Sequence, residues 1–262
     1  MKKGINWWKA DFCRVFSSKV FWGSILLLPL CDLLSLYAEG FWDLDAISMF
    51  YDTMRLGFVM AYLVIYTIPF SHSYCSDKNH HFIRYQVIRG NVGKYAASKV
   101  LFCALGSGCV ALVGKATTLG ILSLKFPLYD KMILTEDSTD VFSVLIRDGK
   151  ILHIMIAMLV LVMLEGAFYG VVAFTVSTFL TNPFLVAASP ILFKQFFSEA
   201  TFWIPDEIYY RYFSLMGTFD VRGDKFQTLG GEVLYAFVFV GIGIAIMMFL
   251  SYKRIKRGFE NE

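Results

Sequence analysis

The sequence predicts an all-α membrane protein with six transmembrane helices, an interfacial helix at the N-terminus and a cytoplasmic helix between the second and third spans. Hydrophobic residues make up 57% of the 262 residues and charged residues only 17%, whereas soluble domains average about 45–50% and about 25%. The apolar residues gather in runs of roughly 20, the length that crosses a bilayer as a helix. Lys and Arg are concentrated in alternate segments, as in chains that cross a membrane repeatedly.

Residues 1–18 are predicted to form an amphipathic helix that lies in the membrane interface. Aromatic rings and bases share this segment: Trp7, Trp8, Phe12 and Phe16 with Lys2, Lys3, Lys9 and Arg14. Such a helix puts its rings at the acyl boundary and its charges among the headgroups. The first apolar run lacks a small-residue cleavage site and five more spans follow, so we do not expect a removable signal peptide.

The six spans are predicted at residues 19–37, 56–70, 100–124, 151–180, 184–197 and 233–252. The fourth is long enough to tilt or protrude, whereas the fifth is short for a crossing and contains Pro190 and Lys194. An acidic loop with Glu39, Asp43, Asp45 and Asp52 is expected after the first span, a polar loop at 125–150, and an outer re-entrant stretch at 199–232.

The distribution of bases predicts the orientation. With the N-terminus inside, 14 of the 24 Lys and Arg residues fall in cytoplasmic segments and 7 in outer loops. This bias favours a multi-pass protein of the plasma membrane with both termini in the cytoplasm. Because the charges are sorted by membrane side, the net charge of +3 gives no indication of nucleic-acid binding.

Residues 71–99 form the most basic internal segment, with five bases against the single acid Asp77. Asp77 to Arg89 can form a short helix that Gly90 ends. Apolar side chains recur there at helical spacing and have bases around them: Phe82, Ile83, Gln86 and Val87, with Arg84 and Arg89. This pattern favours a docking surface for a cytoplasmic protein, and the alternative is a connector that lies on the headgroups.

Three charged residues fall inside predicted spans, namely Asp32, Lys115 and Glu165. A charge in hydrocarbon costs several kcal/mol, so such groups pair or face water. Lys115 and Glu165 lie at similar depth, so Glu165 either pairs with Lys115 or lines a pathway. Gly166 and Gly170 form a small-residue face that fits a contact within the chain or between subunits equally well.

We expect no cofactor, metal or catalytic site on this chain, and no disulfide among its five cysteines. Gly114-Lys115 resembles a phosphate-binding loop, but Cys109 replaces the first Gly and Ala116 the Ser or Thr that would hold magnesium. Adjacent His80 and His81 point about 100° apart on a helix, which favours a surface role over a metal site. Gly106-Ser107-Gly108 with His153 is more typical of helix packing than of a serine protease.

The layout, and the residues Asp77, Ile83-Arg84, Gly90 and Ser98-Lys99, resemble the permease subunit of type-two ATP-binding-cassette exporters, especially the small bacterial permeases of peptide or antibiotic export. His80-His81 and Val92-Gly93 depart from the Gly-Thr and Ser-Arg that the family commonly has. The resemblance implies that 71–99 is a coupling loop whose helix seats in a groove of a separate ATPase subunit.

Several expectations follow from this resemblance. The ATPase-coupling residues would be Asp77, Phe82, Ile83, Arg84, Val87, Arg89 and Gly90. ATP and magnesium would bind the ATPase, a second identical or homologous permease would complete the assembly, and the substrate would be an amphipathic or lipophilic peptide, antibiotic or lipid-like molecule.

Two other functions remain open from the sequence. One is a substrate-capture membrane subunit of an energy-coupling uptake transporter, which would not need a basic coupling helix of its own. The other is a membrane-embedded lipid-modifying enzyme, which should gather acids, His or Ser at one membrane face.

Overall fold

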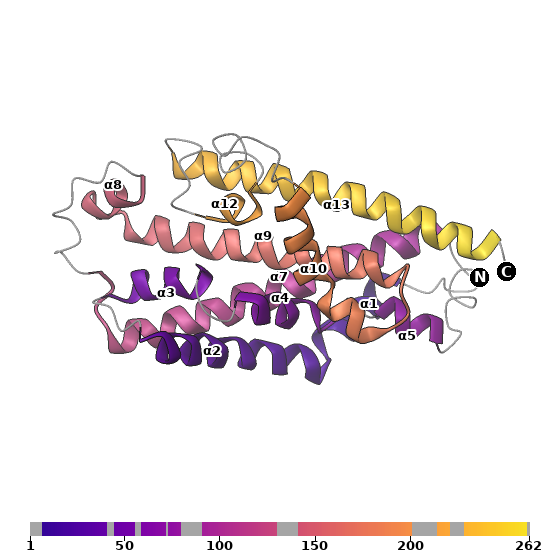
Figure 1. Ribbon diagram of the computed structural model, residues 1–262, viewed down its shortest axis with the longest axis horizontal. Helices are drawn as coiled ribbons and strands as arrows, with labels where there is room; N and C mark the ends of the chain where they lie inside the picture. The colour runs from indigo at the N-terminus through magenta and orange to yellow at the C-terminus, as the bar shows by residue number, and fades with distance from the viewer. Residues whose placement is uncertain are drawn as a thin grey trace.

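The computed structural model describes residues 7–40, 45–55, 59–71, 73–79, 91–129, 141–200, 214–220 and 228–260, and all regular structure in these ranges is helical. Within them, four helices are long and apolar enough to span a membrane: α2 (Lys19–Glu39), α7 (Val92–Lys125), α9 (Ile151–Ser177) and α13 (Leu229–Glu260). They lie side by side in an elongated bundle (Figure 1). The chain is a helical membrane protein, as the sequence predicts.

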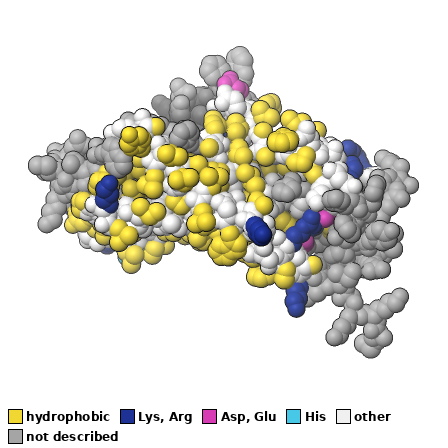
Figure 2. Space-filling model, turned by 90° about the horizontal axis from the view of Figure 1, so that it is seen from below, with side chains coloured by type: hydrophobic (Ala, Val, Ile, Leu, Met, Phe, Trp, Pro, Cys, Tyr) yellow, Lys and Arg dark blue, Asp and Glu magenta, His cyan; other side chains and the backbone are white. Residues whose placement is uncertain are grey.

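The surface supports this class. Figure 2 shows a face covered largely by hydrophobic side chains. On α2 alone, Trp22, Leu26, Leu30 and Leu34 are each more than half exposed. Soluble proteins rarely expose continuous apolar patches of this kind, whereas a bilayer covers them.

The long helices form two parallel pairs, α2 with α7 and α9 with α13. The contacts that set these directions are Leu28 with Gly114, Asp32 with Thr118, Phe168 with Gly243, and Thr175 with Ser251. Between the pairs α7 and α9 are antiparallel, because Gly166 lies against Ala111 and Gly170 against Cys103. The long helices occur along the chain in the order α2, α7, α9, α13. The two parallel helices of each pair are therefore consecutive, and the chain has to return along the bundle between them.

Three short helices make the first return: α3 (Ala46–Arg55), α4 (Val59–Thr67) and α5 (Ser73–Asn79). They follow one another along the bundle from the end of α2 towards the start of α7 (Figure 1). Phe50, Leu63, Tyr66 and Phe70 in this return are almost fully buried. A discontinuous backbone at membrane depth is tolerated where protein surrounds it.

This return corrects two sequence predictions. The second span, predicted at 56–70, is helical in its described part only over α4, whose nine residues rise about 13 Å. The predicted acidic loop contains α3, because Asp45 caps it: the Ser48 N–H donates to Asp45 Oδ1 at 2.6 Å. Apolar residues of α3, such as Ile47 and Phe50, then pack into the core.

The second return begins with α10 (Pro183–Ala200), which packs against α9 and α4. It is longer than the predicted fifth span, 184–197, and it continues through Pro190. α10 is not among the four candidate spans. The structure therefore supports four of the six predicted transmembrane helices. Of the predicted outer stretch 199–232, the described part includes the single turn α12 (Leu215–Thr218) and the start of α13.

The four remaining predicted spans correspond to the four candidate spans, with shifted ends. α2, α9 and α13 contain most of 19–37, 151–180 and 233–252. α7 begins eight residues before its predicted start at 100, since the Asn91 side chain accepts from the Gly93 N–H at 2.7 Å and caps the helix. α1 (Trp7–Phe16) matches the predicted N-terminal helix and packs on α7, and α8 (Val141–Arg147) packs on α9.

Candidate functional site: two buried charge clusters

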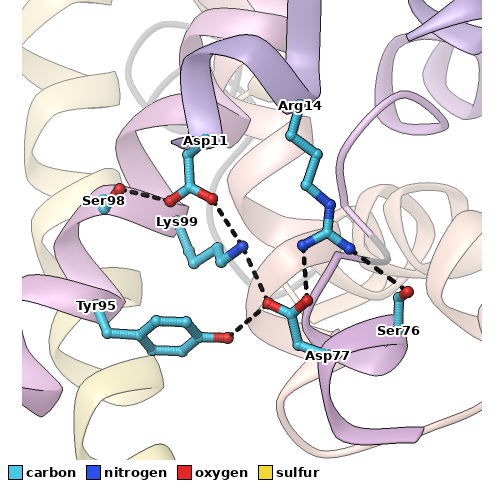
Figure 3. Close-up of polar contacts among 7 residues, drawn as sticks. All are labelled: Asp11, Arg14, Ser76, Asp77, Tyr95, Ser98 and Lys99. Atoms are coloured by element: carbon cyan, nitrogen blue, oxygen red, sulfur yellow. Dashed lines mark hydrogen bonds and ion pairs between the residues drawn. The ribbon is translucent and has the colours of Figure 1, made fainter. Parts of the chain in front are cut away.

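The first cluster joins α1, α5 and α7, and we call it the basal cluster: Asp11, Arg14, Ser76, Asp77, Tyr95, Ser98 and Lys99 (Figure 3). At its centre, Lys99 Nζ lies 2.8 Å from Asp11 Oδ1 and 3.0 Å from Asp77 Oδ2. The Lys99 side chain is 1% exposed and that of Asp77 2%. Lys99 therefore links two acids from different helices inside the protein.

Further donors complete the basal cluster. Arg14 Nη1 donates to Asp77 Oδ1 at 2.6 Å, and the Tyr95 hydroxyl to Asp77 Oδ2 at 3.1 Å. Ser98 Oγ donates to Asp11 Oδ2 at 2.6 Å. Two acids thus face two bases, and each carboxylate receives at least two donors, as a buried ion-pair network requires.

Burial alone would raise the pKa of the Asp77 carboxyl. The charge of Lys99 and the hydrogen bond and charge of Arg14 outweigh burial and hold this pKa below its ordinary value. Asp77 is therefore ionised in the folded protein. On the same helix, burial raises the pKa of the Cys75 thiol, which donates to the Leu180 carbonyl after α9 at 3.2 Å.

Helical spacing assembles the basal cluster. Asp11 and Arg14 are three residues apart on α1, and Tyr95, Ser98 and Lys99 lie within four residues on α7, so each set shares a helix face. Asp77 is one of the predicted coupling residues and Lys99 ends the predicted cytoplasmic coupling loop, and the structure buries both. The i, i+3 and i+4 spacing of these polar residues is the signal that could have indicated the site.

The other predicted coupling residues, Phe82, Ile83, Arg84, Val87, Arg89 and Gly90, lie outside the described residues, as do His80 and His81. The described flanks do correct one boundary. The helix containing Asp77 begins at Ser73, four residues earlier than predicted, and the segment after Asn91 is already helix α7.

The second cluster lies deep in the bundle, and we call it the central cluster: Asp32, Thr53, Tyr62, Lys115 and Thr118. Lys115 Nζ donates to Asp32 Oδ1 at 2.7 Å, with side chains 1% and 0% exposed. It also donates to the Thr53 carbonyl at 3.2 Å and lies 4.0 Å from the centre of the Tyr62 ring. Thr118, one turn beyond Lys115, donates to the other Asp32 oxygen at 2.6 Å.

Of the two alternatives for Glu165, an ion pair with Lys115 is wrong, because the partner of Lys115 is Asp32. The reason is the register of the long helices. Gly166 lies level with Ser107 and Ala111, so Lys115 is at least one turn farther along α7 and faces α2, where Asp32 reaches it.

Glu165 instead borders a small polar cavity of about 10 Å³, which Lys115, Tyr62 and Tyr66 also line. A cavity of this size is close to the smallest that holds one water molecule. Lys194 of α10 and Lys115 are the bases whose charges act on Glu165. The alternative sequence interpretation, in which Glu165 lines a pathway, stays a prediction.

The Gly166 and Gly170 face is used within the chain. A Cβ on Gly170 would lie 2.5 Å from Ser107 Cβ, and one on Gly166 would lie 2.6 Å from Ala111 Cβ. α7 and α9 therefore approach backbone to backbone, as small residues permit in membranes. This close contact joins the antiparallel helices α7 and α9 at the centre of the bundle.

Comparisons with protein families, curated proteins and solved structures find no match to this chain. In the part of the chain that the structure describes, no three His, Cys, Asp or Glu side chains are grouped to hold a metal ion. Both clusters connect helices through buried ion pairs and hydrogen bonds, an arrangement suited to fixing or transmitting helix positions.

Proposed function

We propose that this chain is the permease subunit of an ATP-driven exporter in the plasma membrane, with a separate ATP-binding-cassette ATPase and a second identical or homologous permease as partners. It moves an amphipathic or lipophilic substrate by alternating access. The observation that carries the proposal is the basal cluster, which fastens both ends of the predicted coupling segment to the bundle.

The geometry of this attachment supports force transmission. Residues 80–90 connect α5 to α7, and the Asp77–Lys99 ion pair joins those two helices at 3.0 Å just beside the segment. Arg14 adds α1 to the same point. A partner that moves residues 80–90 therefore moves α1, α5 and α7 together, and α7, with 34 residues, carries that motion along about 50 Å.

The returns between parallel helices support the proposed topology. If α3–α5 and the segment beginning with α10 both recross the membrane, the chain makes six crossings and both termini lie in the cytoplasm. The discontinuous first return also resembles the broken helices that border binding sites in transporters. Glu165 and its water-sized cavity lie beside that return, between α4 and α9.

The test is ATPase recovery. Phe82→Ala with Arg84→Ala removes one apolar and one basic anchor, and anchors of this kind each contribute about 2 kcal/mol or more to an interface. The pair should release the ATPase in a pull-down at equal membrane abundance, or uncouple ATP hydrolysis from transport. The matched control, Leu124→Ala with Lys125→Ala, removes the same two kinds of side chain at the far end of α7 and should recover the ATPase normally. Equal recovery and equal transport by both variants would exclude the proposal.

A further inference from the structure

The structure contains an apolar groove between α9 and α13 that neither cluster uses. Its volume is about 610 Å³, within the range of ligand pockets. Side chains of α8, α9 and α13 line it, nearly all apolar: Leu145, Ile156, Ala157, Val160, Leu229, Val233, Leu234 and Phe237, with Gly230. The first turns of α9 and of α13 lie at the same end of the bundle, beside α8 (Figure 1).

The polar lining of the groove gathers at this end, at Lys150 and His153, which are both exposed. Lys150 Nζ lies 3.1 Å from Asp148, with both side chains about half exposed, so this pair is weak and leaves ammonium donors available. Arg147 is also exposed beside it, and the first turn of α9 contains no acid and has no side-chain cap. Glu232 on α13 is buried and does not line the groove.

The length of the groove matches one leaflet of a bilayer. From Lys150 to Val160 the lining of α9 extends over ten residues, and from Leu229 to Phe237 that of α13 over eight, which correspond to about 15 Å and about 12 Å. Half of the hydrocarbon core of a bilayer is about 15 Å. Because both walls belong to candidate spans, the groove opens to the bilayer with its basic end at the headgroup level.

We propose that this groove is a binding site for an anionic phospholipid of the surrounding membrane. One acyl chain lies between α9 and α13, and the phosphate contacts Lys150, His153 and the amide groups that begin α9, where the helix dipole favours an anion. The class of ligand follows from the apolar lining, the leaflet length and the basic end. The inference is independent of the exporter function, since any membrane protein with this groove could hold such a lipid.

The experiment uses the full chain in phosphatidylcholine nanodiscs, with trace phosphatidylglycerol or phosphatidylcholine that carries a photoreactive diazirine in one acyl chain. We expect phosphatidylglycerol to label groove residues such as Val160 and Phe237 in preference to phosphatidylcholine. Gly230→Leu should remove most of this labelling, because a Cβ at Gly230 meets nothing within 4 Å and the side chain would occupy the groove. Gly258→Leu, equally open at the far end of the same helix, is the matched control and should label as the unaltered protein does.

The headgroup contribution is tested separately. Lys150→Gln with His153→Gln should lower phosphatidylglycerol labelling about fivefold or more, the effect expected of one base near a charged surface, and leave phosphatidylcholine labelling unchanged. Lys253→Gln with Lys256→Gln removes two bases at the other end of the bundle and should have no effect on groove labelling. Equal labelling by both lipids, unchanged labelling of Gly230→Leu, or cross-links from the groove to a second copy of the chain would overturn the proposal.

Discussion

Lys99 illustrates how a single buried charge organises several elements. Its ammonium is the only base in the described basal cluster that contacts both acids, since Arg14 pairs with Asp77 alone. Taking an ion out of water costs several kcal/mol unless its partners are in place. The ion pairs therefore specify the docking of α1 and α5 on α7 more than they add net stability.

Lys99→Met should destabilise the protein by about 3–5 kcal/mol, because it leaves Asp11 and Asp77 buried without the base they share. The measurement is the thermal unfolding midpoint in detergent. Lys94→Met, five residues earlier on the same helix and exposed, is the control and should change the midpoint little. Equal midpoints of the two variants would contradict the role assigned to the basal cluster.

The pH dependence of this difference has a defined sign. The pKa of Asp77 is lowered in the folded state, so its contribution to stability is complete above the ordinary aspartate pKa of about 3.9 and is lost as the pH falls below that value. The stability advantage of the unaltered protein over Lys99→Met should therefore be largest near neutral pH and shrink in acid, where the carboxyl is protonated in both proteins.

At the level of helices, the α7–α9 contact depends on the absence of side chains. Gly170→Ala should destabilise the bundle by about 1–3 kcal/mol, because its Cβ would meet Ser107 Oγ and Cβ and force the helices apart. Gly120→Ala on α7 adds a Cβ where nothing lies within 4 Å and should raise stability by up to about 1 kcal/mol through helix propensity. Thermal midpoints that move in the same direction for both variants would refute this account of the contact.

The sequence predicts some of these elements and not others, for physical reasons. Long apolar runs identify α2, α7, α9 and α13, because a helix that faces lipid is hydrophobic on every side. α3 and α5 are short and contain the acids Asp52 and Asp77, and Asp45 caps α3. In the sequence these acids suggest solvated loops until their partners are known. The Asp32–Lys115 pair joins residues 83 apart. The sequence does not reveal the register of α2 against α7, which makes Asp32 rather than Glu165 the partner of Lys115.

For the molecule as a whole, the parallel pairs place α1, the start of α7 and the end of α13 at one end of the bundle. Val15 and Ile255 belong to the same buried core, and a Cβ at Gly93 would lie 3.7 Å from the Tyr252 ring. The start of α9, with Lys150, lies at the other end (Figure 1). The two ends should therefore face opposite sides of the membrane.

A single cysteine at Lys150 should react with a membrane-impermeant maleimide added to intact cells, and one at Lys94 should react only after the membrane is opened. Both positions are exposed, so a difference in labelling would report the side of the membrane and not burial within the protein. The background is removed by replacing with Ser the exposed Cys13 and the partly exposed Cys31 and Cys109, since Cys75 and Cys103 are buried. The reverse labelling pattern would overturn the orientation derived from the distribution of bases.

The distance along the chain between Asp32 and Lys115 also has a consequence for biosynthesis. The ribosome adds the 83 residues that separate them in roughly 4–17 s at typical rates of synthesis. During that interval the nascent α2 carries an acid without its partner, at a cost of several kcal/mol in hydrocarbon. We therefore expect the position of α2 in the bilayer to become fixed only when Lys115 of α7 pairs with Asp32. A chain whose translation stops before α7 should therefore keep an unpaired acid in α2, whereas in the completed chain Lys115 pairs with it.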